Sequence, residues 1–245
     1  MSEQGWNQQE IATGFDQAAD ILHPYYHVLH DKLFELFPFK EKDSAVVVDL
    51  GGGSGHFARK VLNEFPKATL ILIDQSEPFL NIARRRLAPF GDRALFLCSN
   101  LQDNWLSKLP EKADIVVSMS AIHHLTDQEK DTLFHRSYYA LKEGGRFANT
   151  DLFYEENVTY FKELVRNWMA TIKQAQQNGR IPKQLDKLLL EWKTQMLAVT
   201  DGEANRRNFF PQTPDKQIDA LAGSSFKHPK MTWRRELWAL LVADK

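Results

Sequence analysis

The feature that most constrains the fold is a glycine-rich segment that joins a short apolar run to a helix-forming stretch. Residues 46–48 are three valines, Asp49 and Leu50 follow, and residues 51–55 read Gly-Gly-Gly-Ser-Gly. A uniformly apolar, β-branched run suits a parallel strand that is buried on both faces. Glycines allow positive φ angles and close approach of a ligand, and the following helix supplies free N–H groups. This segment therefore predicts a strand–loop–helix unit that binds a ligand.

Apolar runs of strand length alternate with helix-like stretches along the chain, which predicts a doubly wound α/β fold. The last two runs are close enough in sequence to form an antiparallel hairpin, which a purely parallel fold lacks. We therefore predict a mostly parallel, seven-stranded Rossmann-like sheet with an antiparallel C-terminal hairpin. The expected strands are 46–48, 70–73, 94–97, 115–117, 146–150, 226–233 and 236–243.

Composition excludes several classes of function. Lys and Arg total 31 against 32 Asp and Glu, so the net charge of −1 offers no general attraction to nucleic acid or to an anionic membrane. The single cysteine, Cys98, excludes an intramolecular disulfide, and its apolar strand predicts a buried side chain. The N-terminus lacks the pattern of a signal peptide, and no apolar run approaches the roughly 18 residues of a membrane span. We therefore expect a cytoplasmic protein.

Two acidic residues end consecutive predicted strands, where ligands bind in open α/β sheets. Asp74 ends the second strand, and its carboxylate could accept two hydrogen bonds from a ribose diol. The residues 53–58 also fit the G-x-G-x-x-A pattern of dinucleotide sites. Asp49, however, suits a ligand with a cationic amino acid end better than a pyrophosphate. A tight strand–helix turn without a ligand is the alternative.

These motifs together resemble the class I S-adenosylmethionine-dependent methyltransferases, over about residues 40–151 and the closing helix and hairpin. Residues 46–55 look like the family's acid-x-Gly-x-Gly-x-Gly motif, and residues 113–118 look like its fourth-strand motif. Residues 141–145 are similar to its Leu-Lys-Pro-Gly-Gly turn, with Glu143 in place of proline. Asn100 stands where the family usually has an acid that contacts adenine.

The resemblance implies S-adenosyl-L-methionine as the cofactor and no metal. Asp49 would lie near its amino acid end, Asp74 on its ribose and Asn100 at its adenine. Tyr26 could reach over the cofactor from an N-terminal helix, although core packing explains it equally well. The cofactor-binding residues we predict are Asp49, Gly51, Gly53, Gly55, Asp74, Gln75, Asn100, Leu101, Ser118 and Tyr26.

A histidine pair, His123 and His124, follows the fourth predicted strand, where an acceptor would approach the methyl group. Imidazole titrates near neutral pH and can take a proton from a hydroxyl or an amine. In the small-molecule O-methyltransferases a catalytic histidine occupies this point, and His123 takes the matching place. The alternative is that one histidine packs the next helix and the other contacts the cofactor. No ligand spacing for zinc is present.

The pattern along the chain predicts a single methyltransferase domain over residues 1–245. It comprises an N-terminal helical cap (1–40), a cofactor-binding core (41–156), a helical insertion that acts as a lid (157–212), and a closing helix and hairpin (213–245). The insertion is rich in Trp and Met, which suits an apolar substrate site, a homodimer contact or an ordinary helix–helix core. Arg206 and Arg207 are candidates for binding an acidic substrate group.

We predict methyl transfer from S-adenosylmethionine to a small organic acceptor, at oxygen or nitrogen, by direct displacement. Two alternatives remain at this point. A tRNA- or rRNA-modifying methyltransferase would share the core but would need a continuous basic surface. A nicotinamide-dependent dehydrogenase, or a cofactor-binding protein without chemistry, would use the same fold differently.

Overall fold

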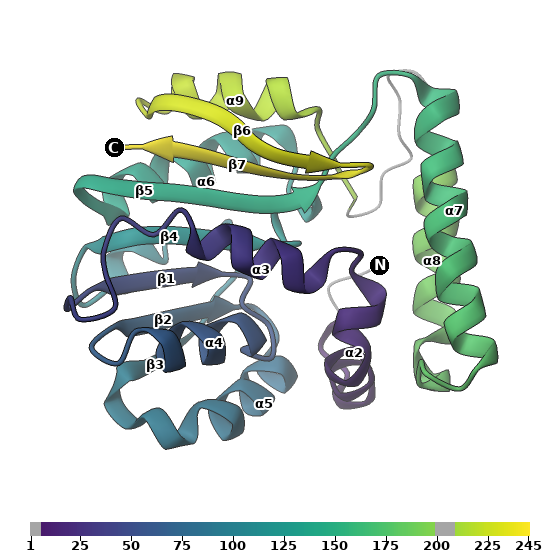
Figure 1. Cartoon of the computed structure of the whole chain (residues 1–245), viewed down its shortest axis with the longest axis horizontal. Helices are drawn as coiled ribbons and strands as arrows, with labels where there is room; N and C mark the ends of the chain where they lie inside the picture. Colours follow the sequence, from purple (N-terminus) through teal and green to yellow (C-terminus); the bar gives the residue numbers. More distant parts are fainter. Residues whose placement is uncertain (1–5, 199–208) are drawn as a thin grey trace.

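Seven strands form one sheet in the computed structural model, which describes residues 6–198 and 209–245. The strand order is β3-β2-β1-β4-β5-β7-β6, with β1 to β5 parallel and the β6–β7 hairpin joined antiparallel to β5 (Figure 1). The predicted sheet, including its antiparallel C-terminal hairpin, is confirmed. The strands are β1 (Val46–Leu50), β2 (Thr69–Asp74), β3 (Ala94–Cys98), β4 (Ala113–Met119), β5 (Leu141–Leu152), β6 (Lys227–Arg235) and β7 (Trp238–Asp244).

Helices cover both faces of the sheet and stand beyond the carboxyl ends of its parallel strands (Figure 1). Helices α3, α4 and α5 pack on one face, and α6 and α9 pack on the other. The helices are α2 (Gln9–Leu22), α3 (Tyr26–Phe34), α4 (His56–Glu64), α5 (Glu77–Leu87), α6 (Asp127–Ala140), α7 (Val158–Gln177), α8 (Asp186–Leu197) and α9 (Pro214–Gly223).

The valine run of β1 is buried on both faces, as its composition predicts. Val47 packs in a core with Phe57 of α4, whereas Val46 and Val48 pack in the opposite core with Phe134 of α6. Successive side chains on a strand point to opposite faces, so a strand between two helical layers needs apolar residues at every position.

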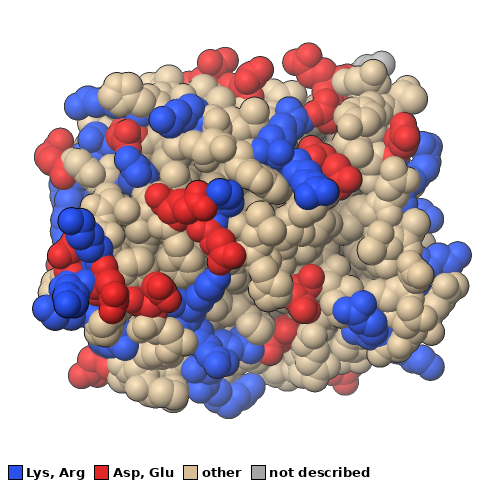
Figure 2. Space-filling model, viewed as in Figure 1, with Lys and Arg blue, Asp and Glu red and all other residues tan. Residues whose placement is uncertain are grey.

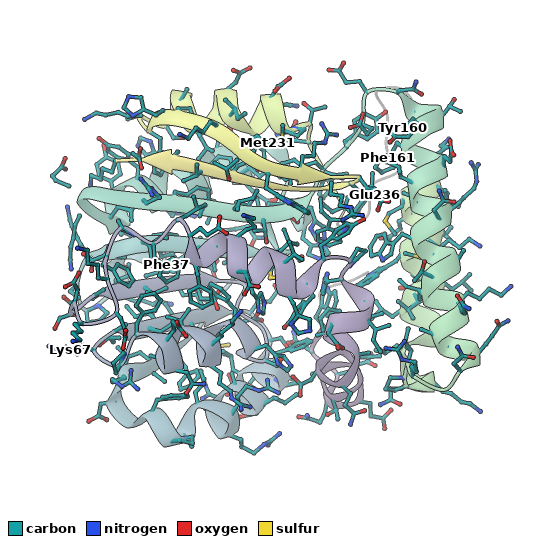
Figure 3. The ribbon with its side chains drawn as sticks, in the orientation of Figure 1. Phe37, Lys67, Tyr160, Phe161, Met231 and Glu236 are labelled. Atoms are coloured by element: carbon teal, nitrogen blue, oxygen red, sulfur yellow. The ribbon has the colours of Figure 1, made fainter. Side chains whose placement is uncertain are left out.

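A third core joins α2 to the helical pair α7 and α8. Phe161 is fully buried there, while its neighbour Tyr160 is 47% exposed on the outer surface of α7 (Figure 3). Leu22 of α2 and Leu188 of α8 belong to the same core. The N-terminal helix and the insertion therefore form one wall beside the carboxyl ends of the strands, with one amphipathic face of each helix turned inward.

Two details differ from the sequence-based predictions. Cys98 is exposed, because it ends β3 at the edge of the sheet, so the prediction of a buried thiol was wrong. Strand β5 is also longer than predicted and extends to Leu152. Arg206 and Arg207 lie outside the described residues. The division into cap, core, insertion and closing segment, and a homodimer contact, stay predictions.

An ion-pair cluster fastens α2 to the glycine-rich segment. Asp16 of α2 lies 2.9 Å from Nη1 of Arg86 and 2.8 Å from Nε2 of His56, the first residue of α4. Arg86 also donates to the carbonyl oxygen of Ser54. Burial acts to raise the pKa of Asp16, but the bonds from His56 and Arg86 outweigh it and hold the pKa below its usual value. The cluster therefore fixes the N-terminal helix beside the loop that follows β1.

Replacing Asp16 with asparagine should destabilise the fold at pH 7, because it leaves the charge of Arg86 partly buried without its partner. We expect a loss of about 1–3 kcal/mol in the free energy of unfolding, measured by urea denaturation. Asp20→Asn, an exposed position on the same helix, is the matched control and should change little. Equal stabilities of the two variants would contradict the role of the cluster.

Candidate active site

A cavity of about 230 Å³ lies beyond the carboxyl ends of the parallel strands. Residues of the loop after β1 and of the end of β2 line it, together with aromatic residues of the N-terminal segment and of the insertion. His123 belongs to the same lining. The cavity therefore brings the predicted cofactor side and the predicted base together. The predicted site residues among its lining are Gly51, Gly53, Asp74, Gln75, Leu101 and His123.

Gly51 and Gly52 stand where no larger residue fits. Gly51 has a φ of +70°, and a Cβ atom built on it would lie 2.4 Å from the Cβ of Ala121. A Cβ atom on Gly52 would lie 2.7 Å from Oδ2 of Asp49. Gly55 also has a positive φ, but it faces Ala83 of α5 and does not line the cavity. The loop thus packs tightly against Ala121 on one side and Asp49 on the other, and its glycines present backbone without side chains to the cavity.

Asp74 is held by the loop. Its Oδ2 accepts a hydrogen bond from the N–H of Gly53 at 2.9 Å, and its Oδ1 accepts one from the N–H of Ser76 at 2.8 Å. Burial raises the pKa of Asp74 to about 6, although these backbone bonds partly oppose it. The carboxylate lines the cavity at the place where the sequence predicts the ribose.

Asp49 lies behind the loop and not in the cavity lining. It is 2% exposed, and its Oδ2 has no hydrogen-bond partner among the described residues. Burial, together with the charge of Asp74, raises the pKa of Asp49 to about 7. Two acidic groups are therefore held in a place where a positively charged ligand group would relieve their repulsion.

Besides Asp49 and Gly55, three more predicted cofactor residues lie outside the cavity lining. The side chain of Ser118 is fully buried and donates to the carbonyl oxygen of Leu50 at 3.0 Å, which ties β4 to β1. Asn100 donates to Asp103 at 3.2 Å, while its neighbour Leu101 lines the cavity. Tyr26 packs on His30 with 4.3 Å between ring centroids. In this structure these side chains make contacts within the protein.

His123 is held by a buried carboxylate that the sequence analysis did not single out. Its Nδ1 lies 2.5 Å from Oδ1 of Asp151, and its backbone N–H donates to Oδ2 of Asp151 at 2.9 Å. Burial acts to raise the pKa of Asp151, but the charge of His123 and three hydrogen bonds outweigh it and lower the pKa. Asp151 is thus an anion that orients the imidazole through Nδ1. The second ring nitrogen, Nε2, is not bonded to Asp151.

Two further residues of the lining, Ser120 and His23, escaped the sequence analysis. Ser120 has a φ of +57° directly after β4, and its buried hydroxyl has no partner among the described residues. His23 follows α2, and its buried Nδ1 is likewise unpartnered in the described part of the chain. Asp151 had a detectable pattern, because it is an acid near a strand end like Asp49 and Asp74. His23 and Ser120 had none.

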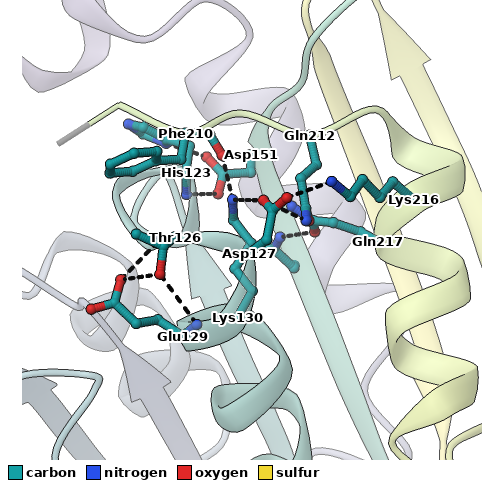
Figure 4. A network of polar contacts seen from close by, with 11 residues as sticks. His123, Thr126, Asp127, Glu129, Lys130, Asp151, Phe210, Gln212, Lys216 and Gln217 are labelled. Carbon is teal, nitrogen blue, oxygen red and sulfur yellow. Dashed lines mark hydrogen bonds and ion pairs between the residues drawn. The ribbon is translucent and has the colours of Figure 1, made fainter. Parts of the chain in front are cut away.

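A polar network behind His123 anchors the segment that brings Phe209 into the cavity (Figure 4). The N–H of Phe210 donates to the carbonyl oxygen of His123 at 2.7 Å. The fully buried Lys130 of α6 donates to the carbonyl oxygen of Phe210. Gln212 donates to Asp127 at 2.8 Å. The ring of Phe209 then packs edge-on against His123, with 5.7 Å between centroids.

The described residues hold neither a metal cluster nor a membrane-spanning helix. Residues 6–198 and 209–245 contain no group of three or more His, Cys, Asp or Glu side chains placed to bind a metal ion. In the same residues, no helix combines the length and the apolar composition that a membrane crossing requires.

Comparison with known proteins agrees with this geometry. A family model described as a methyltransferase domain matches residues 47–145, which include the loop after β1, Asp74 and His123. Residues 47–145 are a methyltransferase domain, and the seven-stranded sheet is that of the Rossmann-like methyltransferases. S-adenosylmethionine is therefore the cofactor, and the chain is a methyltransferase.

The similar proteins differ in what they modify. A carboxy-S-adenosyl-L-methionine synthase of Nautilia profundicola is 21% identical to this methyltransferase over 97% of the chain and 93% of that protein. A ribosomal RNA small subunit methyltransferase H of Corynebacterium glutamicum is 40% identical over 32% of the chain, but only 24% of that protein. The structure of human N-acetylserotonin methyltransferase with its cofactor has a TM-score of 0.63 at 18% identity. It matches 98% of this chain, which spans 57% of the human chain.

The residues present fit S-adenosylmethionine. The unpartnered Oδ2 of Asp49 is a buried acceptor directly behind the loop, and its charge would attract a cationic amino group bound on the other side of the loop. Gly51 and Gly53 have positive φ angles that disfavour any side chain, and a side chain on Gly51 would also collide with Ala121. Because both positions carry no side chain, a ligand can approach the backbone of the loop closely.

Asp49→Asn should stabilise the methyltransferase without its cofactor at pH 8. A carboxyl whose pKa is raised by folding favours the native state only while protonated, so its contribution is lost as the pH rises from 3.8 toward about 7. We expect a gain on the order of 1–3 kcal/mol at pH 8 that disappears near pH 4, together with weaker S-adenosylmethionine binding. Thermal unfolding at both pH values and calorimetric titration measure these effects.

The exposed Asp92→Asn variant is the control and should change neither stability nor binding. A destabilised Asp49→Asn protein at pH 8 would show that the buried carboxylate is compensated within the protein.

Proposed function

We propose that this methyltransferase transfers the methyl group of S-adenosylmethionine to an oxygen or nitrogen atom of a small organic acceptor. The observation that carries this proposal is the Asp151–His123 pair, which lines the same cavity as Gly51, Gly53 and Asp74. When bound, the cofactor supplies a methyl group on a sulfonium, which is already activated for displacement. The protein must then position the acceptor and accept its proton.

The proposed base is Nε2 of His123. Because Nδ1 faces the ionised Asp151, the neutral imidazole carries its proton on Nδ1, and Nε2 has a free lone pair. A proton arriving at Nε2 forms an imidazolium that the neighbouring carboxylate stabilises. The backbone bond from His123 to Asp151 fixes the turn that carries the ring, so orientation and charge come from one residue.

A small acceptor is favoured over RNA by charge and by enclosure. The face shown in Figure 2 carries interspersed acidic and basic side chains and no continuous basic stripe, and the whole chain has a net charge of −1. The cavity is walled by aromatic residues of the N-terminal segment and α8, such as Trp6 and Trp192. An RNA-modifying enzyme needs many basic contacts to the phosphate backbone.

Modification of the cofactor itself is a second candidate. It is favoured by the relative from Nautilia profundicola, because that protein is named a carboxy-S-adenosyl-L-methionine synthase and the match spans nearly the whole chain. Mass spectrometry of the nucleotide that copurifies with the protein separates the two candidates. S-adenosylmethionine or S-adenosylhomocysteine supports methyl transfer, whereas a carboxylated cofactor supports the second candidate.

Asp74→Ala should weaken S-adenosylmethionine binding about 10- to 100-fold, because two hydrogen bonds from the ribose hydroxyls lose their charged acceptor. Isothermal titration calorimetry measures the affinity. Asp74→Asn keeps the shape of the side chain and should show part of the loss. Glu77→Ala, at an exposed site at the start of α5, is the control. Unchanged affinity in Asp74→Ala would remove this residue from the cofactor site.

His123→Ala should lower the turnover number about 10²- to 10⁴-fold while S-adenosylhomocysteine affinity stays the same. Release of S-adenosylhomocysteine with a hydroxylated acceptor measures turnover, and the exposed His135→Ala is the matched control. Asp151→Asn should lower turnover less than His123→Ala, because the imidazole keeps its place but loses the carboxylate that orients its ring. Full turnover in His123→Ala would leave positioning alone as the basis of catalysis.

A further inference from the structure

Aromatic rings of distant segments wall much of the cavity, from Trp6, whose carbonyl accepts a hydrogen bond from Ser76 beside Asp74, to Trp238 of β7. Trp6 lies 5.5 Å from Phe15 and 6.1 Å from Trp192 between ring centroids. Trp168 lies 6.5 Å from Trp192 and 5.8 Å from Trp238. All five rings line the cavity. Such rings offer flat, rigid apolar surfaces that prefer to stack on, or meet edge-on, another planar ring.

Charged side chains are nearly absent from this lining. Among the described residues, Asp74 is the only Asp, Glu, Lys or Arg that lines the cavity, and it belongs to the cofactor side. An anionic acceptor would lose its hydration here without gaining a positively charged partner from the described residues. The described lining therefore favours an uncharged acceptor.

His23 supplies a polar group within the aromatic wall. Its ring packs edge-on against Phe15 and Trp238, each at 5.5 Å between centroids, and its Nδ1 is buried without a partner in the described part of the chain. Burial lowers the pKa of His23 to about 4, and the charge of His123 acts in the same direction. The imidazole is thus neutral at physiological pH, and a buried unpaired nitrogen costs free energy until a ligand pairs with it.

We infer that the acceptor is an uncharged, planar aromatic molecule with a hydroxyl group, and that Nδ1 of His23 hydrogen-bonds this hydroxyl while the aromatic rings hold its body. The inference rests on the proposed function, since the hydroxyl is the group that His123 would deprotonate. His23 then acts as a second imidazole on the acceptor, distinct from the base. It selects for a polar substituent, and the rings select for planarity.

Binding of defined probes tests this inference in the presence of saturating S-adenosylhomocysteine. Fluorine NMR titration follows 6-fluoro-2-naphthol and 6-fluoro-2-naphthoate, and trans-2-decalol serves as a non-planar competitor. We expect the naphthol to bind at least tenfold more tightly than either the naphthoate or the decalol. Equal binding of the naphthoate, equal competition by the decalol, or no naphthol binding would overturn the inference.

Variants separate the hydrogen bond from the aromatic wall. His23→Phe should weaken binding of 6-fluoro-2-naphthol about tenfold, consistent with one lost hydrogen bond, while binding of 2-fluoronaphthalene is unchanged. Trp192→Leu should weaken both probes. His135→Phe and Trp233→Leu, which alter residues outside the cavity lining, are the matched controls. A His23→Phe variant that binds both probes like the wild type would remove His23 from the acceptor site.

Failure of this inference and failure of the proposed function give different results. If S-adenosylhomocysteine binds and the naphthol does not, the inference fails and methyl transfer to another acceptor class stands. If the naphthol binds with the expected selectivity but S-adenosylmethionine yields no methylated product with any hydroxylated aromatic, the proposed oxygen chemistry fails instead.

Discussion

The close contact between Gly51 and Ala121 determines the arrangement of the whole site. The backbone N–H of Gly51 donates to the carbonyl oxygen of Ile73 at 2.7 Å, which presses the loop against the end of β2. On its other side the loop meets Ala121, two residues before His123, so closely that a Cβ on Gly51 would overlap it. Only glycine allows this approach at a positive φ. The approach brings the cofactor loop and the turn that carries the proposed base to one cavity.

Around that contact the fold keeps several buried polar atoms unpaired. Oδ2 of Asp49, Oγ of Ser120 and Nδ1 of His23 lack hydrogen-bond partners among the described residues. Each costs free energy in the protein without ligands. Ser120 adds a positive φ at a residue with a side chain, a strained backbone of the kind that concentrates at functional sites. Bound ligands that pair with these atoms recover this free energy, so stability and binding oppose each other here.

The residues that could be predicted from the sequence are those whose position follows from the strand pattern. The sheet, the hairpin and the placing of Asp74 and His123 at one cavity needed only apolar periodicity and the rule that ligands bind at the carboxyl ends of strands. Asp151 follows its predicted strand just as Asp49 and Asp74 follow theirs, but it was missed because no local pattern shows that it meets His123. Cys98 was placed wrongly because an apolar run does not show whether its strand is central or at an edge. His23 depends on how α2 packs against β7, which no local pattern encodes.

The segment at residues 209–212 links substrate choice to catalysis. Phe209 lines the cavity, while its neighbour Phe210 is bonded through its N–H to the carbonyl of His123 and through its carbonyl to Lys130. A fully buried lysine is costly unless acceptors solvate its charge, and the carbonyl of Phe210 in this segment is one such acceptor for Lys130, beside the carboxylate of Asp127. The ring that shapes the acceptor side and the turn that carries the base are therefore held by one network. A sequence change that moved Phe209 to admit a different acceptor would also shift His123 relative to Asp151. Trp168 of α7 is held differently, because its Nε1 donates to the carbonyl oxygen of Leu22 at 3.1 Å, so a change of acceptor specificity at this position acts on α2 and not on the bond between Phe210 and His123.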